Sequence, residues 1–137
     1  MGNIIRLNGT APGSERIVMS NQGTDCFLEL LITAAASFEK TGRQEELISF
    51  LKDRKDVNEI APGTAGFDLD EMPWRDETLE DDAGFLLRVT EEAQSESVLA
   101  KLPYEADKSI VIPWLQQFAR FIAHRKNGAE RVRGSKT

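Results

Sequence analysis

The sequence predicts an α+β fold that is mainly helical, and three observations lead to this prediction. Residues 24–41 read as one helix that is apolar on nearly every side, which is typical of a buried central helix. Two short apolar runs, at about 3–7 and 16–20, flank a stretch of turn residues and predict an N-terminal β-hairpin. Further apolar stripes with helical spacing follow, so we expect the hairpin to pack on a cluster of four or five helices.

The central helix is expected to begin at Thr24 or Asp25, because either side chain can cap a helix N-terminus. Gly42 is expected to end it, since glycine is the usual residue just past a helix. Its strongly apolar part, about a dozen residues, is too short to span a bilayer. Its polar residues form one narrow stripe, made of Glu29, Thr33, Ser37 and Lys40.

Apolar periodicity predicts the remaining helices at about 43–54, 78–94, 95–102 and 113–126. Thr78 and Asp81 approximate a capping box for the helix that starts there. Pro103 is expected to end the short helix before it. Residues 109–112 are rich in β-branched side chains, so they fit either a third strand or the first turn of the last helix.

The chain has 137 residues, the length of one domain; we expect 1–127 to form it and 128–137 to be a disordered polar tail. The net charge of -6 argues against a DNA partner and against an anionic membrane surface. A single cysteine fits a reducing compartment, and the N-terminus does not read as a secretory signal, so a cytoplasmic location is expected.

Negative charge is concentrated between Asp68 and Asp82, where eight acidic residues accompany one base, Arg75. Apolar and aromatic residues are interleaved with these acids. Exposed aromatic side chains in an acidic surface would suit the docking of a basic protein. The residues expected to make this contact are Phe67, Asp68, Asp70, Glu71, Met72, Trp74 and Asp76. The other interpretation is a solvated loop followed by a helix start, where acids are favourable in any case.

The leading functional hypothesis is therefore a small, cytoplasmic, non-enzymatic binding protein that docks a basic partner through segment 67–82. Regulators, inhibitors and immunity-like proteins have this general profile of small size and acidic charge. No cofactor is expected. A homodimer built on exposed Phe and Trp side chains is a further hypothesis.

The alternative hypothesis is an enzyme that uses Mg²⁺ to act on a nucleotide or another phosphorylated substrate. Carboxylates one helical turn apart can hold Mg²⁺, and the candidates are Glu77, Glu80 and Asp81. Their spacing resembles the ExxE carboxylate pairs of helical nucleotide pyrophosphohydrolases. That resemblance implies a second acidic pair on a facing helix, for which Glu91, Glu92 and Glu96 are the nearest candidates.

Cys26 and His124 are the remaining residues with reactive side chains that the sequence singles out. A cysteine in the first turn of a helix can be an activated thiolate, but next to Phe27 a small buried core residue is the expected role. His124 lies near the end of a predicted helix, where a basic residue complements the helix dipole.

Overall fold

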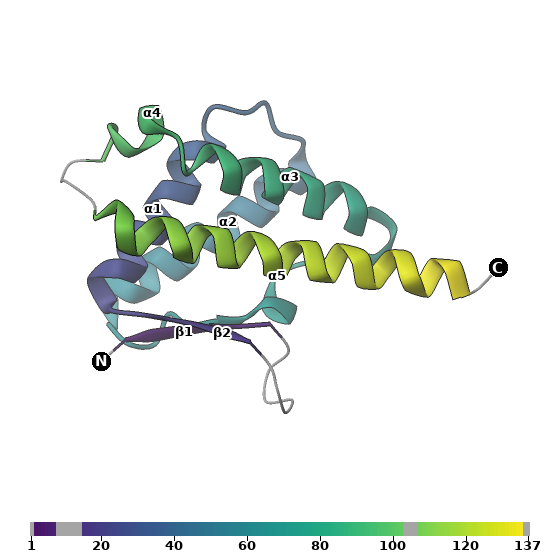
Figure 1. Cartoon of the computed structure of the whole chain (residues 1–137), viewed down its shortest axis with the longest axis horizontal. Helices are drawn as coiled ribbons and strands as arrows, with labels where there is room; N and C mark the ends of the chain where they lie inside the picture. The colour runs from purple at the N-terminus through teal and green to yellow at the C-terminus, as the bar shows by residue number, and fades with distance from the viewer. Residues whose placement is uncertain (1, 8–14, 103–106, 136–137) are drawn as a thin grey trace.

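The computed structural model describes residues 2–7, 15–102 and 107–135, and for 127–135 it describes the backbone. The fold is α+β and mainly helical, as the sequence predicts (Figure 1). The strands and helices in chain order are β1 (Asn3–Arg6), β2 (Arg16–Met19), α1 (Asn21–Ala35), α2 (Gly42–Ile60), β3 (Phe67–Asp68), the short 3-10 helices η1 (Leu69–Glu71) and η2 (Asp76–Thr78), α3 (Leu79–Glu92), α4 (Glu96–Leu99) and α5 (Lys108–Ser135).

The sheet has the order β2-β1-β3, with β1 antiparallel to β2 and parallel to β3. The predicted hairpin is confirmed, but the third strand is Phe67–Asp68; residues 109–112 lie in α5. β3 approaches β1 so closely that a Cβ on Gly66 would lie 2.5 Å from the Ile4 carbonyl oxygen. Only glycine fits there, and this long-range contact is not visible in the sequence.

The central helix α1 is buried as predicted, but it is displaced towards the N-terminus. Ser20 caps it by accepting a hydrogen bond from the Gly23 amide at 3.0 Å, so the expected cap at Thr24 or Asp25 is wrong. The helix ends at Ala35, and Gly42 begins α2 instead of ending α1. The reason is a capping box in which Thr41 and Gln44 exchange side-chain and backbone hydrogen bonds.

The later helices also differ from their predicted bounds. α2 extends to Ile60, past the expected end at Arg54. α5 begins at Lys108, before Pro113, and continues to Ser135, so Asn127 and Gly128 do not stop it. α4 ends at Leu99, before the expected end at Pro103, a residue that lies outside the described part of the chain. The division between a domain and a tail at 127/128 stays a prediction.

The core lies where α1 meets the other helices and the inner face of the sheet. Ile5, Ile17 and Met19 face inwards from the sheet and are 1% exposed, whereas Val18 points outwards and is 57% exposed. On the helical side, the rings of Phe27 in α1 and Phe118 in α5 meet edge to face at 5.3 Å. Figure 1 shows α5 running alongside α3 and extending past it. None of the described helices is long and apolar enough to cross a membrane.

A neutral polar network, centred on Asn3, is buried between the sheet and the first two helices. The Asn3 amide nitrogen is 2.9 Å from Thr24 Oγ1 and 3.0 Å from Asn58 Oδ1. Its oxygen accepts a hydrogen bond from the Ala65 amide at 2.8 Å. Asn58 in turn donates to the Asn21 carbonyl. This network ties β1, α1, α2 and Ala65, two residues before β3, together without any charged group.

Candidate functional site

Segment 67–82 leaves the sheet at β3 and leads through η1 and η2 into α3. Phe67 and Met72 are 4% and 3% exposed, and the Phe67 ring packs edge to face on Phe50 at 5.1 Å. The expectation that these two side chains are exposed anchors is therefore wrong. Pairing of β3 with β1 turns Phe67 into the core, and Leu69 and Met72 are buried along with it. They attach the segment to the rest of the protein.

Trp74 is half-buried, and its ring makes contacts with other residues of the protein. Its indole N–H donates to the Leu69 carbonyl at 2.8 Å, and the Arg125 guanidinium of α5 lies 5.5 Å from its ring centre. Arg125 also pairs with Asp70. Desolvation lowers the pKa of Arg125, and the nearby Asp68 carboxylate partly offsets that effect. Trp74 is therefore a second attachment point, contrary to the expected role as a free anchor.

Two further predicted residues stabilise the local backbone. The Asp68 carboxylate accepts a hydrogen bond from the Asp70 amide at 2.9 Å, and Glu71 reaches back to the Asp68 amide at 2.7 Å. Together they form a capping box around η1. Of the predicted docking residues, the structure leaves Asp70, Glu71 and Asp76 exposed.

The homodimer hypothesis loses its proposed surface, because the large hydrophobic side chains exposed in the described part of the chain include no Phe or Trp. Those that are exposed are Val18, Ile60 and Ile110. Homodimer formation itself stays a prediction. Cys26 is 5% exposed in α1, which matches the expected core role, and His124 is exposed on α5.

The structure does not assemble the alternative magnesium site. Among the described residues, no three His, Cys, Asp or Glu side chains are grouped so that they could hold a metal ion, so Glu77, Glu80 and Asp81 do not form one. The nearest candidates do not supply the second acidic pair that the ExxE resemblance implies on a facing helix. Glu91 and Glu92 lie on the same helix as Glu80, and Glu96 pairs with Lys108 at 2.7 Å.

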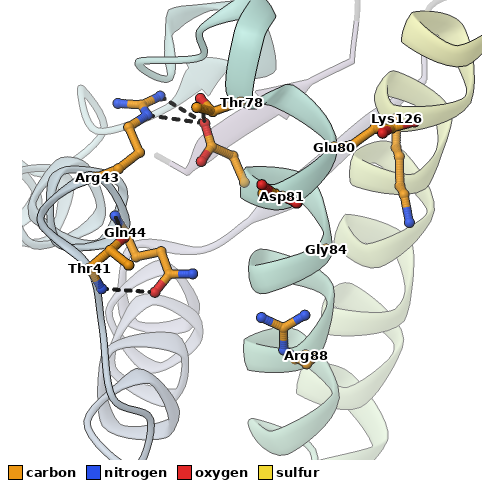
Figure 2. A pocket seen from close by; sticks show the side chains of 10 residues that line it. Thr41, Arg43, Gln44, Thr78, Glu80, Asp81, Gly84, Arg88 and Lys126 are labelled. Atoms are coloured by element: carbon orange, nitrogen blue, oxygen red, sulfur yellow. Dashed lines mark hydrogen bonds and ion pairs between the residues drawn. The ribbon is translucent and has the colours of Figure 1, made fainter.

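A pocket of about 620 Å³ opens where the first turns of α2 and α3 face each other (Figure 2). Sequence reasoning missed it, although Gly84 in the middle of α3 was a readable signal. In Figure 2, Thr41 and Gln44 form the α2 side of the opening, and Lys126 lies on α5, beyond α3. The residues that line it are Thr41, Arg43, Gln44, Thr78, Glu80, Asp81, Asp82, Gly84, Arg88 and Lys126.

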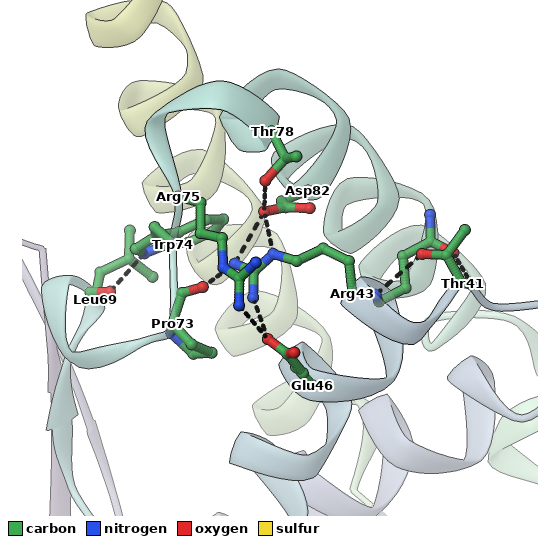
Figure 3. A network of polar contacts seen from close by, with 10 residues as sticks. Thr41, Arg43, Glu46, Leu69, Pro73, Trp74, Arg75, Thr78 and Asp82 are labelled. Carbon is green, nitrogen blue, oxygen red and sulfur yellow. Dashed lines mark hydrogen bonds and ion pairs between the residues drawn. The ribbon is translucent and has the colours of Figure 1, made fainter.

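An ionic network centred on Arg43 closes one end of this pocket (Figure 3). The guanidinium lies 3.0 Å from Asp82 Oδ2, bonds the Pro73 carbonyl and pairs with Glu46 at 2.6 Å. Thr78 donates its hydroxyl to the same Asp82 oxygen at 2.9 Å. Asp82 is 2% exposed, so its charge is balanced inside the protein. Arg43 thereby joins the first turn of α2 to both ends of residues 73–82.

The predicted capping box between Thr78 and Asp81 is wrong for the same reason. The Thr78 side chain makes no capping hydrogen bond, because its hydroxyl is used by Asp82 one turn into the helix. Asp81 instead remains exposed on the pocket wall. Two adjacent aspartates, which the sequence does not distinguish, therefore have different roles.

No protein-family model, curated protein or solved structure matches this chain. The geometry and charge of segment 67–82 and of the pocket beside it are therefore the features that bear on function.

Proposed function

We propose that this protein is a non-enzymatic binding protein that docks a basic partner protein through an acidic face. The acidic face is defined here as the exposed carboxylates of Asp70, Glu71, Asp76, Glu77 and Asp81. It differs from the surface expected from the sequence, since the apolar residues Phe67, Met72 and Trp74 are removed from it. Complementary charge speeds the encounter of two proteins and favours the correct orientation.

The observation that carries this proposal is the way the acidic segment is held. Its regular elements are short, namely β3, two 3-10 helices and the first turn of α3, and contacts from three other elements fix it. Arg43 of α2 binds its second half, Arg125 of α5 covers Trp74, and β1 pairs with β3. A surface that is ordered before binding loses less conformational entropy when a partner arrives.

The charge balance of the segment supports a basic partner. Asp82 and Asp70 are paired with Arg43 and Arg125, but the side chains of Glu77 and Asp81 make no hydrogen bond or ion pair with the residues that the structure describes. Both are exposed. An excess of exposed negative charge at one site attracts cations over roughly one Debye length, about 8 to 10 Å at physiological salt.

The test uses an oligo-arginine peptide as the basic probe and the full chain as the receptor. A face variant, Asp70→Asn with Asp76→Asn and Glu77→Gln, removes three charges from the acidic face. A control variant, Asp53→Asn with Asp56→Asn and Glu91→Gln, removes three exposed charges elsewhere. We expect the face variant to bind roughly tenfold more weakly in calorimetry at low salt, since each exposed pair contributes about 0.2 to 1 kcal/mol.

The control variant should lose much less affinity than the face variant, and peptide-induced shifts of backbone amide signals should concentrate in residues 70–82. Equal losses in the two variants, or shifts spread evenly over the protein, would mean that the peptide responds to net charge alone and would refute the proposal.

A further inference from the structure

Some of the charged residues that line the pocket between α2 and α3 are paired with each other. Arg43 and Asp82 neutralise each other inside the protein. Figure 2 shows Glu80 on the side of α3 that faces α5, the helix that carries Lys126. On the other side of α3, the charged residues of the pocket wall are Asp81 and Arg88. Neither side chain makes a hydrogen bond or ion pair within the part of the chain that the structure describes, and both are exposed.

Gly84 lies between these two residues, and nothing in the packing of the fold requires a glycine there. A Cβ built on Gly84 would meet only the Arg88 guanidinium, at an ordinary contact distance of 3.7 Å. The contrast with Gly23 is clear, because a Cβ there would lie 2.5 Å from the Trp114 ring. A glycine inside a helix costs about 1 kcal/mol relative to alanine. What it provides at position 84 is an open pocket floor.

Arg88 is the basic side chain on the same wall of the pocket as Asp81. Its guanidinium lies over the bare backbone of Gly84, on the same side of α3 as Asp81 (Figure 2). The two residues are seven positions apart, about 10 Å along the helix, and their side chains make no ion pair with each other. A long basic side chain from outside can fill this space with its charged end at Asp81.

We propose that this pocket receives an arginine or lysine side chain of the partner, with its charged end paired to Asp81. In the free protein, Arg88 occupies the neighbouring space and moves aside when the partner's side chain enters. The aliphatic stem of that side chain lies over Gly84, and the hydroxyl oxygens of Thr41 and Thr78 are the nearby neutral acceptors. This inference rests on the proposed function and assigns the central contact of the acidic face.

The experiment measures the affinity of oligo-arginine for the full chain. It compares substitutions that we expect to weaken binding with one that we expect to strengthen it. Asp81→Asn should weaken binding about fivefold more than Glu77→Gln, which removes the same charge from a residue that does not line the pocket. Arg88→Ala should strengthen binding about twofold to fivefold, because it removes both a like charge and a competitor for the space. Gly84→Leu places an apolar side chain in the part of the pocket next to Asp81 without changing charge and should weaken binding about tenfold, with Gly84→Ala as its milder counterpart.

The outcomes separate the pocket from the proposed function. If the face variant weakens binding but Asp81→Asn matches Glu77→Gln and Arg88→Ala gives no gain, the pocket inference is overturned and the acidic face stands. If Arg88→Ala abolishes binding of an oligo-glutamate peptide and Asp81→Asn enhances it, the pocket accepts anions and the inference is overturned. If oligo-arginine does not bind at all, both proposals fall. Asp81→Asn and Arg88→Ala change exposed side chains, so they give an answer even if Gly84→Leu fails to fold.

Discussion

Two buried polar networks hold this protein together, one neutral and one ionic, and they serve different regions. The neutral network around Asn3 joins the sheet to the first two helices, where every partner is an amide, a hydroxyl or a carbonyl. The ionic network around Arg43 joins α2 to the acidic segment. Neutral hydrogen-bonded groups are cheaper to desolvate than ions, so they suit a core that has to be closed completely. The ionic network has a buried pair, Arg43 and Asp82, but extends to the surface at Glu46, which is 50% exposed, and by our proposal it supports the face that meets the partner.

The largest expected effect comes from breaking the ionic network. Arg43→Met leaves Asp82, which is 2% exposed, without its counter-charge and leaves the Pro73 carbonyl without its donor. Removal of one member of a buried ion pair costs about 3 to 5 kcal/mol of unfolding free energy. Urea unfolding of the variant measures this loss.

The matched control for Arg43→Met is Arg75→Met, because Arg75 pairs with the same Glu46 at 3.5 Å but is 55% exposed. It should lose less than about 1 kcal/mol. Equal losses in the two variants would contradict the assignment of Arg43 as the residue that holds the acidic segment. Arg43→Met should also weaken oligo-arginine binding, since the carboxylates it positions become mobile.

The neutral network should be the second most sensitive site. Asn3→Ala removes the acceptor of the Ala65 amide and the donor shared by Thr24 and Asn58, all of which are buried. Buried groups left without a hydrogen bond cost about 1 to 3 kcal/mol, so a loss of roughly 2 to 3 kcal/mol is expected. Thermal unfolding measures it, with the exposed residue Gln22, replaced by alanine, as the control.

Asn3→Ala should leave the pH dependence of stability unchanged, because no titratable group belongs to that network. If Asn3→Ala lowers the stability as little as Gln22→Ala does, water replaces the missing hydrogen-bond partners. The network would then be accessible to solvent.

Alanine substitutions at Gly84 and Gly23 test how much room a side chain has in the pocket and in the core. Alanine at 84 has room and should stabilise the protein by about 0.5 to 1 kcal/mol, whereas alanine at 23 collides with Trp114 and should destabilise it. Differential scanning calorimetry of both variants shows whether each substitution raises or lowers the stability. Destabilisation by Gly84→Ala would indicate that the glycine is needed for packing, which would remove the main support for an open pocket floor.

The sequence predicted the features that depend on local periodicity. The apolar residues around Phe27 repeat as a helix and are buried in one, and the two hairpin strands pair as expected. A glycine between two helical stretches can end the first helix or begin the second, so Gly42 alone does not decide this boundary. The capping box of Thr41 and Gln44 is the sequence signal that does, and it assigns Gly42 to α2.

The features that the sequence could not predict depend on contacts between distant residues. β3 has two residues, too few for any periodicity, and it exists because Gly66 lets the chain approach β1. Asp81 and Asp82 are identical and adjacent, and only the position of Arg43, 39 residues before Asp82, makes one buried and the other exposed. The acidic character of the candidate site was therefore predictable, and its division into buried and exposed carboxylates was not.

The smallest expected effect concerns the ionic contacts of Lys55, which join α1 to α2 on the outside of the core. Lys55 lies 2.9 Å from Glu59, 3.3 Å from Asp25 and 3.7 Å from Glu29. The Glu59 carboxylate, and after it that of Asp25, raise the pKa of Lys55 above its ordinary value despite an opposing desolvation effect. Because the partners are partly exposed, Lys55→Met should cost about 0.5 kcal/mol at neutral pH.

The sign of the pH dependence follows from the raised pKa. The folded protein holds the Lys55 proton more tightly than the unfolded chain, so the contribution is fully present below the unfolded pKa of about 10.4 and is lost as pH rises through the folded value. The stability difference between the natural protein and Lys55→Met should therefore stay constant up to about pH 10 and shrink above it. Lys52→Met, a change at an exposed lysine of the same helix, should show no such trend. If both differences are flat with pH, Lys55 is a solvated surface residue, and the polar stripe of α1 faces water without contributing to the contact with α2.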